Sequence, residues 1–200
     1  MRIVLASASP RRRALMAALG LEFDVIPSDA HEVDEGAAPE AIVIANARRK
    51  RDDVVARLDS PALVIAADTL VFLDGSVLSK PKDLDDARAM LRQLSGRTHQ
   101  VITGLAIAGP DGRLIEGSET TGVTFRDLTD PEIAHFVHAV KPTDRAGAYT
   151  VDGPGSLLVA SYNGCFQNVL GLPIVRLDHL LRPLGYDLFE LMDGPRSIFL

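Results

Sequence analysis

The unbroken apolar run Ala62–Ala67 is the feature that most constrains what this chain can fold into. A strand with one face in water alternates apolar and polar residues, whereas a strand covered on both faces is apolar throughout. The run therefore predicts a central strand with other elements packed against both faces. Segments with helical periodicity lie on either side of it in the sequence, so we expect helices to provide this cover and the protein to be of the α/β class.

Expected helices and strands alternate along the chain. Ser9 is a candidate N-cap for a helix that begins at Pro10 and ends before Gly20. Further helices are expected at residues 39–58, after Asp83, after Asp130 and after Pro173. Strands are expected at residues 3–6, 21–25, 62–67, 71–78 (with a turn at 74–75), 100–108, 119–125 and 156–160. Because hairpins interrupt the alternation, we expect a mixed, twisted sheet with flanking helices. No repeat or linker divides the sequence, so residues 1–200 are expected to form a single domain.

Bulk composition argues against several classes of function. The sequence has no apolar run of about 18 residues, so no membrane span is expected, and its N-terminal apolar run is too short for a secretory signal. The formal net charge of −6 argues against a general nucleic-acid-binding surface, so a site for a polyanion must be a local positive island. Cys165 is the only cysteine, which excludes an intrachain disulfide and favours a cytoplasmic location.

The segment Ser7-Ala8-Ser9-Pro10-Arg11-Arg12 lies at an expected strand-to-helix junction. A helix N-terminus presents free N–H groups and the positive end of the helix dipole, and serine hydroxyls and arginines add donors suited to phosphate oxygens. The alternative is an ordinary capped helix with solvated arginines. However, arginines in a first helical turn oppose the dipole, which favours a bound anion to balance them.

Asp68 and Thr69 directly follow the apolar run. Open α/β sheets bind ligands at the carboxyl ends of their strands, so Asp68 is expected where it could hold Mg²⁺ or activate water as a general base. The alternative is a carboxylate that only accepts hydrogen bonds from amides at the end of the strand.

Two lysines and a glutamate carry weaker signals. Lys80 precedes Pro81, which fixes the local backbone, and could reach into a cleft or simply be solvated. Lys50 belongs to a run of four cations, Arg48–Arg51, whose side chains point all around a helix, so at most one or two of them can face a site. Glu32 lies in an acidic loop, where a solvated role is common.

Other nucleotide, metal and ester chemistries lack their motifs. The sequence contains neither the phosphate-binding pattern GxxxxGK[ST] nor the dinucleotide fingerprint GxGxxG. His135 and His138 are the only close histidine pair, without the cysteine or glutamate partners of a zinc site. The esterase pattern GxSxG is also absent.

Taken in order, the candidate residues belong to a larger set of motifs that resembles the Maf family of nucleoside triphosphate pyrophosphatases. The resemblance covers nearly the whole chain. Each motif is weak alone, but the ordered set is specific, and it consists of Ser7–Arg12, the Glu32 region, Lys50 in Ala-Arg-Arg-Lys, Ala67-Asp68-Thr69, Lys80-Pro81, Gly96–Val101 with Thr103-Gly104, Arg145–Tyr149 and Asn168–Pro173.

The resemblance implies a mixed α/β fold with two lobes around a cleft, similar to the inosine-triphosphate pyrophosphatase architecture. It also implies cleavage between the α- and β-phosphates of a nucleoside triphosphate, assisted by a divalent cation such as Mg²⁺ or Mn²⁺. Asp68 would then be the proton acceptor, and Glu32 and Lys80 would complete the catalytic set. Glu32 and Asp68 would hold the metal. The substrate would be bound by Ser7, Ser9, Arg11, Arg12 and Lys50.

The residues expected to set specificity are Arg11, Thr69 and Asp152. Thr69 resembles the dTTP/UTP branch of the family, whereas the 7-methyl-GTP branch typically has glutamine there. Asp152 departs from the glutamine usual in the pyrimidine branch; an ionised Asp only accepts hydrogen bonds, which would suit the N3–H of uracil or thymine or else serve the metal. Arg145 replaces the more usual lysine and keeps its charge.

We therefore expect a dTTP/UTP pyrophosphatase that acts in cleaning the nucleotide pool. The alternatives are a pyrophosphatase for 7-methyl-GTP or for many nucleotides, and a nucleotide-binding regulator of septum formation. We expect no nucleic-acid or membrane partner. A homodimer is permitted by aliphatic residues near the C-terminus that we expect to be exposed, namely Leu188, Leu191 and Met192.

Overall fold

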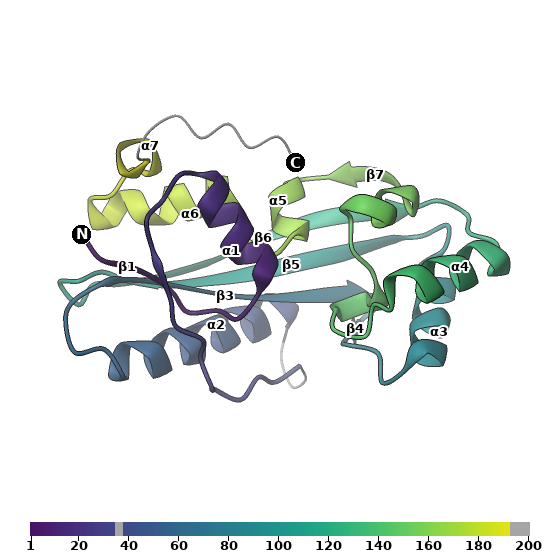
Figure 1. Cartoon of the computed structure of the whole chain (residues 1–200), viewed down its shortest axis with the longest axis horizontal. Helices are drawn as coiled ribbons and strands as arrows, with labels where there is room; N and C mark the ends of the chain where they lie inside the picture. The colour runs from purple at the N-terminus through teal and green to yellow at the C-terminus, as the bar shows by residue number, and fades with distance from the viewer. Residues whose placement is uncertain (35–37, 193–200) are drawn as a thin grey trace.

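A mixed sheet is the centre of the structure. The computed structural model describes residues 1–34 and 38–192, and within these ranges the strands form one seven-stranded sheet in the order β2-β1-β3-β5-β6-β7, with β4 added to β3 (Figure 1). β1 is parallel to β2 and β3, and the other pairings are antiparallel. The strands are β1 (Ile3–Leu5), β2 (Asp24–Val25), β3 (Leu63–Leu73), β4 (Ser76–Leu78), β5 (Thr98–Ala108), β6 (Leu114–Phe125) and β7 (Val159–Asn163). The expected mixed α/β class is confirmed.

Helices cover both faces of the sheet. The helices are α1 (Pro10–Ala18), α2 (Pro39–Ala56), α3 (Leu84–Leu94), α4 (Asp130–Val140), α5 (Phe166–Val169), α6 (Ile174–Leu181) and α7 (Leu188–Leu191), with short 3₁₀ turns at Ala146–Ala148, Gly153–Leu157 and Arg182–Leu184. Figure 1 shows α2 on one side of the long strands and α1 and α6 on the other. None of the helices in the described part of the chain is long and apolar enough to cross a membrane.

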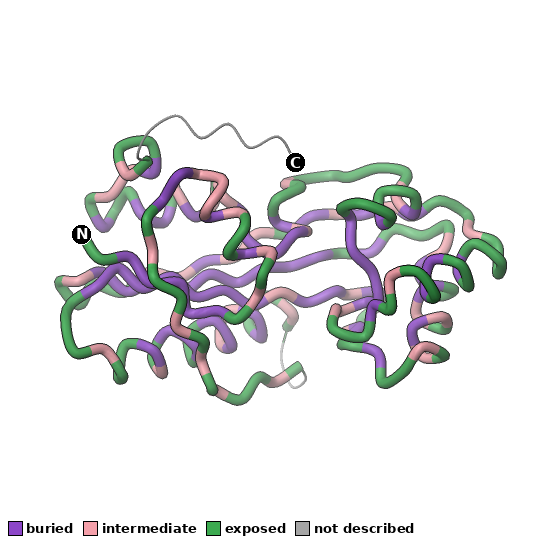
Figure 2. The backbone as a smooth tube through the Cα atoms, viewed as in Figure 1, coloured by how far each residue is buried: buried purple, intermediate pink, exposed green. Residues whose placement is uncertain are grey.

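The apolar run in β3 is covered on both faces, as the sequence predicted. Leu63 and Ile65 belong to an apolar cluster that includes residues of α1 and α6, whereas Val64 and Ala66 belong to a cluster that includes Val54 of α2. Side chains of β3 therefore point alternately toward α1 and α6 on one face of the sheet and toward α2 on the other. Figure 2 shows this buried centre along the strands.

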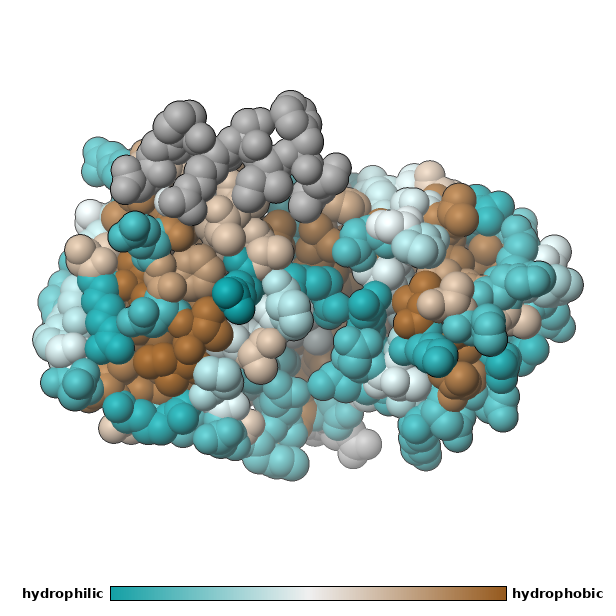
Figure 3. Space-filling model, in the orientation of Figure 1, coloured by the Kyte–Doolittle hydropathy of each residue, from teal (hydrophilic) through white to brown (hydrophobic). Residues whose placement is uncertain are grey.

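The long strands β3, β5 and β6 extend through two lobes (Figure 1). In the lobe with α3 and α4, the strands contribute Val71, Val101 and Val123 to one apolar cluster; in the other lobe, β3 and β5 contribute Ile65 and Leu105 to another. Between these clusters the strands carry the polar residues Asp68, Thr69, Thr103 and Thr121, all buried except Thr69, which is half-buried. The expected two-lobed arrangement thus corresponds to two cores separated by a polar band along shared strands. In the space-filling view, hydrophilic residues cover the middle of this face (Figure 3).

Local signals placed several elements correctly. Ser9 caps α1 and Asp83 caps α3, and α4 begins at Asp130, as expected. A capping box of Thr129 with Glu132 on α4 was not among the expected signals. Asp74 and Gly75 both have positive φ between β3 and β4, which is the turn geometry expected for a tight hairpin.

Four expectations about elements were wrong. The strand expected at 119–125 begins already at Leu114. The strand expected at 62–67 continues to Leu73, because β5 pairs with β3 through the polar residues as well as the apolar ones. The strand expected at 21–25 is reduced to Asp24–Val25. Residues 153–157 form a 3₁₀ turn, and the last strand begins only at Val159.

The surface expected to permit a homodimer is smaller than the sequence suggested. Leu188 is buried and Leu191 packs against the same apolar cluster. Met192 is the one of the three that is exposed. Helix α7 uses its aliphatic side chains to cover the core, so these residues do not form an exposed apolar face.

Candidate active site

The middle of β3 borders a cavity. Among the described residues, β1 pairs with Leu63–Ile65 and β4 with Val71–Leu73 on the edge of β3 that faces away from β5. The part of this edge between them is left without a strand. A cavity of about 340 Å³ lies there and is lined by nearly every site residue predicted from the sequence, namely Ser7, Ser9, Arg11, Arg12, Glu32, Lys50, Asp68, Thr69 and Lys80.

The segment between β1 and α1 forms one wall of the cavity. Ser9 accepts a hydrogen bond from the Arg12 backbone N–H at 3.5 Å, and Ser7 Oγ accepts one from the Ser9 N–H at 3.2 Å. Arg11 is half-buried in the wall. Desolvation and the neighbouring charge of Arg145 lower the pKa of Arg11. Both effects oppose an isolated positive charge there, so an anion in the cavity would stabilise Arg11.

Arg12 has a different position from Arg11. Its buried guanidinium donates to the Gly171 carbonyl at 2.7 Å, to Thr69 Oγ1 at 2.9 Å and to Ser7 Oγ at 3.1 Å. Burial lowers the pKa of this arginine, and all three acceptors are uncharged. Arg12 therefore joins α1, β3 and the segment after α5, and only part of its donor capacity is left for a ligand.

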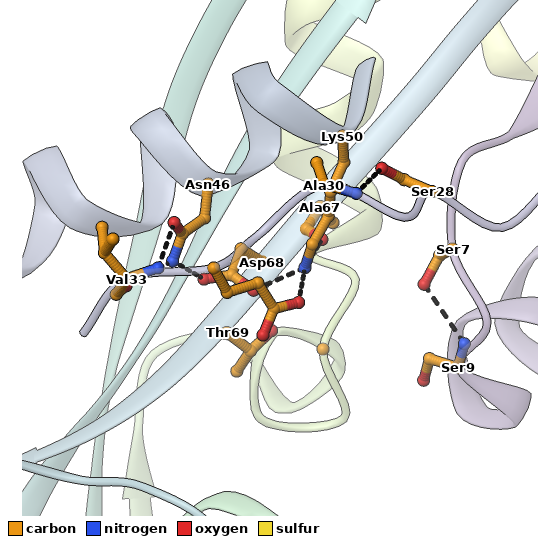
Figure 4. Close-up of polar contacts among 12 residues, drawn as sticks. Ser7, Ser9, Ser28, Ala30, Val33, Asn46, Lys50, Ala67, Asp68 and Thr69 are labelled. Atoms are coloured by element: carbon orange, nitrogen blue, oxygen red, sulfur yellow. Dashed lines mark hydrogen bonds and ion pairs between the residues drawn. The ribbon is translucent and has the colours of Figure 1, made fainter. Parts of the chain in front are cut away.

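A lysine links the two predicted carboxylates. Lys50 Nζ contacts Asp68 Oδ1 at 2.7 Å and Glu32 Oε1 at 2.5 Å, and donates to the Ala67 carbonyl at 3.4 Å. Asp68 and Lys50 are buried, whereas Glu32 is about half exposed. Figure 4 shows Lys50 reaching from α2 to Asp68 on β3.

The position of Asp68 in the strand differs from the expectation. Asp68 lies in the interior of β3, opposite Gly104 of β5, and not at the end of the strand. Its side chain falls on the face covered by α2, because it follows Val64 and Ala66 in the strand alternation. The neighbouring Thr69 points to the opposite face, where it meets Arg12.

Gly104 brings α2 close to the sheet beside Asp68. A Cβ at this position would lie 2.4 Å from the backbone carbonyl of Val43 in α2. The absence of a side chain at Gly104 allows this contact. Asn46 and Lys50, which lie one and two helical turns after Val43 in α2, then reach Asp68.

Asn46 is a site neighbour that the sequence reasoning missed. Its Nδ2 donates to Asp68 Oδ2 at 2.9 Å and to the Val33 carbonyl at 2.7 Å, and its Oδ1 accepts from the Val33 N–H at 3.0 Å. The available signal was its spacing of four residues from Lys50, which places both side chains on one face of a helix.

The run of four cations on α2 resolves as expected, because only Lys50 lines the cavity. Arg48 and Arg51 pair with Glu116 of β6 at 2.6 and 2.8 Å, and Arg49 is exposed. The helical geometry separates these neighbours, although their charges are alike.

Thr69 belongs to a chain of hydroxyl contacts. Its Oγ1 lies 2.9 Å from Thr103 Oγ1, and Thr103 donates to the Asn168 carbonyl at 3.2 Å. Asn168, which is fully buried, donates in turn to the Val101 carbonyl and to Thr121. The side chain of Thr69 is therefore fixed by its neighbours as it lines the cavity.

The second lobe contributes Lys80 and part of the segment 144–151 to the cavity. Lys80 is exposed, and Arg145 contacts Asp144 at 3.3 Å. Asp152 does not line the cavity itself, and its carboxylate accepts a hydrogen bond from the Thr150 hydroxyl. The charge of Asp152 raises the pKa of Arg11, which partly offsets the lowering of that pKa by burial. Asp152 is thus next to the cavity on the side of Arg11.

Tyr149, another lining residue, is held by a buried histidine. His99 Nε2 lies 2.7 Å from the Tyr149 hydroxyl, and His99, Tyr149 and Phe125 pack edge to face in all three pairings. Burial lowers the pKa of His99 to about 4 and raises that of Tyr149. This cluster supports the cavity wall from within the second lobe.

The charges of the cavity suit a polyanion and a water molecule. The cations Arg11, Lys50 and Lys80 line it from three separate elements or loops. Asp68 and Glu32 provide carboxylates beside them. Cations and carboxylates around one cavity are the arrangement that phosphoryl-transfer sites use to neutralise phosphate oxygens while activating a nucleophile.

Known proteins of similar sequence match this chain over nearly its whole length. The chain is 47% identical over 193 residues to a protein of Moorella thermoacetica named dTTP/UTP pyrophosphatase, covering 94% of this chain and 97% of that one. It is 43% identical over 194 residues to a protein of the same name from Caldicellulosiruptor bescii, covering 94% and 98%.

Solved structures give more distant likenesses. The Ham1 protein of Staphylococcus aureus has a TM-score of 0.45 and 20% identity over 64% of this chain and 73% of that one. A nucleoside-triphosphatase (dITP/XTP pyrophosphatase) of Mycobacterium abscessus has a TM-score of 0.44 and 16% identity over 92% and 96%. These likenesses are too remote to bear on the activity.

The family model for Maf-like proteins matches residues 2–184, a range that includes the whole cavity and every site residue placed above. With relatives above 40% identity over nearly the full chain, the match leaves no part of the site outside the shared region. This chain belongs to the Maf-like protein family.

Proposed function

We propose that this protein hydrolyses dTTP and UTP to the nucleoside monophosphate and pyrophosphate. The observation that carries the proposal is that Arg11, Lys50 and Lys80 line the same cavity as the carboxylates of Asp68 and Glu32. A triphosphate carries about four negative charges, which such cations can neutralise. The names of the relatives support the choice of pyrimidine nucleotides.

In the proposed reaction, Asp68 accepts the proton of a water molecule whose oxygen attacks the α-phosphorus. The bond from the α-phosphorus to the bridging oxygen breaks, and pyrophosphate leaves. A carboxylate has about four acceptor positions. Lys50 and Asn46 take one on each oxygen of Asp68, so acceptor capacity remains for water. Arg11 and Lys80 hold the phosphates, and Ser7 and Ser9 line the same wall.

We propose Mg²⁺ or Mn²⁺ as the cofactor, held by Glu32 and Asp68. Within residues 1–34 and 38–192, no three His, Cys, Asp or Glu side chains are grouped to form a metal site made by protein alone. Two carboxylates that contact one Lys50 Nζ nevertheless fit Mg²⁺, which typically binds one or two carboxylates and completes its shell with phosphates and water. When bound, the ion would neutralise charge on phosphate oxygens. We place the reaction in the cytoplasm, where nucleotide pools are found.

A panel of four substrates tests the proposal. Purified protein with Mg²⁺ or Mn²⁺ should release pyrophosphate from dTTP and UTP faster than from CTP or 7-methyl-GTP. Asp68→Asn should abolish the release while the fold is retained, because asparagine has similar size but cannot accept the proton. A preference for 7-methyl-GTP, or equal rates for all four, would replace the assigned substrate. Tight dTTP binding in calorimetry without any product would support a nucleotide-binding regulator instead of an enzyme.

A further inference from the structure

Asn46 connects the Asp68 carboxylate to the backbone of Val33, the residue after Glu32, through one side chain. It lies on α2, is 1% exposed, and is one helical turn before Lys50. Figure 4 shows its amide between Val33 and Asp68. A buried amide at such a position is costly unless its donors and acceptor are paired, and here all are engaged.

The contacts of Asn46 define a rigid geometry. Its Oδ1 accepts from the Val33 N–H at 3.0 Å while its Nδ2 donates to the Val33 carbonyl at 2.7 Å, so the amide holds both backbone groups of the residue after Glu32. The second N–H of the same Nδ2 has Asp68 Oδ2 as its acceptor at 2.9 Å. Because Val33 O and Asp68 are both acceptors, the amide has only one orientation that satisfies all its partners.

Lys50 cannot supply this geometry by itself. Its ammonium contacts Glu32 and Asp68, but it is a compact charge with three equivalent donors on a flexible chain, so it tolerates many orientations of a carboxylate. A second bond, to the other oxygen of Asp68, fixes the rotation of the carboxylate plane. Asn46 provides that bond.

We propose that Asn46 is a positioning residue that fixes the orientation of Asp68 and its distance from the Glu32 segment. The inference rests on the proposed function, since it assigns Asp68 as the acceptor of the water proton. Asn46 has no contact with the cavity itself, so it acts through Asp68 and the Val33 backbone.

Two variants separate the bonds of Asn46. Asn46→Asp keeps a similar shape and the acceptor for the Val33 N–H, but removes the donors to Val33 O and Asp68. Asn46→Leu keeps the branching and removes every hydrogen bond. Val54→Ala is the matched control, because Val54 is a buried residue of the same helix that lies outside the cavity and packs against an apolar cluster.

Steady-state kinetics with dTTP should show a specific loss of turnover. Both Asn46 variants should lower kcat on the order of 100-fold, as expected when a reacting group is misplaced by about 1 Å. KM should change by less than about threefold, because the cations that hold the phosphates do not contact Asn46. Val54→Ala should leave both constants close to wild type while lowering thermal stability. Wild-type kcat in Asn46→Asp, or parallel changes of kcat and KM, would overturn the proposal.

Amide hydrogen exchange gives a readout that does not depend on turnover. The Val33 N–H should remain protected in Asn46→Asp and lose protection in Asn46→Leu, because only the first keeps an acceptor for it. If the wild type releases no pyrophosphate, the proposed function fails, and this measurement still decides whether Asn46 holds the Glu32 segment. Unchanged protection in Asn46→Leu would show that it does not.

Discussion

Acidification should destabilise this protein through one buried histidine. His99 is 2% exposed, and burial lowers its pKa from 6.5 to about 4 in the folded protein. Between these values the unfolded chain binds a proton that the folded chain does not bind. The free energy of unfolding therefore decreases as the pH is lowered from about 6.5 to about 4, and the contribution of His99 is constant above that window.

The size of the effect follows from the two pKa values. Each pH unit within the window corresponds to about 1.4 kcal/mol, so His99 should account for a loss of about 3 kcal/mol at pH 4. This is a large part of the stability of a typical domain. The physical cause is burial of His99 against Phe125 and Tyr149, which removes water from the imidazole and so disfavours its protonated form.

Urea unfolding of wild type and His99→Gln from pH 7.5 to 4.5 measures this contribution. Other groups titrate in the same range, so the relevant quantity is the difference between the two proteins. Relative to the wild type, the variant should gain about 2 to 3 kcal/mol as the pH falls across the window. A flat difference for His99→Gln would refute the assignment of a neutral, desolvated imidazole.

Three further predictions concern the site and its support. Gly104→Ala should lower stability by about 3 kcal/mol and reduce activity, since its Cβ would meet the backbone of Val43. Gly122→Ala should be mild in the same urea assay, because its Cβ would make only ordinary contacts, none closer than 3.6 Å. Arg12→Lys should lower both thermal stability and kcat, since one ammonium cannot reproduce the three hydrogen bonds of the guanidinium; unchanged melting would contradict this structural role. Asp152→Gln should reduce the preference for UTP over CTP by roughly tenfold in kcat/KM, because glutamine can also donate to the base; an unchanged ratio would remove Asp152 from base selection.

The sequence was sufficient for much of the fold because its strongest signals are local. The apolar run in β3 required cover on both faces, and the caps and turn residues fixed where several helices and one hairpin begin and end. It failed where long-range pairing overrides local composition. β3 continues through Asp68 and Thr69 because the ladder with β5 continues, which no local pattern indicates.

For the site, the sequence supplied the residue types and their order, and the cavity collects all of them except Asp152. The roles of neighbouring arginines could not be separated in this way. Arg11 faces the cavity while Arg12 holds three parts of the chain together, because successive residues of a helix point in different directions.

What the sequence by itself determined is the α/β class, the family resemblance and the set of charged residues available for phosphate chemistry. Only the tertiary structure decided which of them meet. Lys50 contacts both Glu32 and Asp68, and Asn46 donates a hydrogen bond that fixes the orientation of Asp68. Both contacts are possible because Gly104 lets α2 approach β5 beside that carboxylate. Such contacts depend on the distance between a helix and a sheet, a quantity set by packing across the whole core and not by any local segment of sequence.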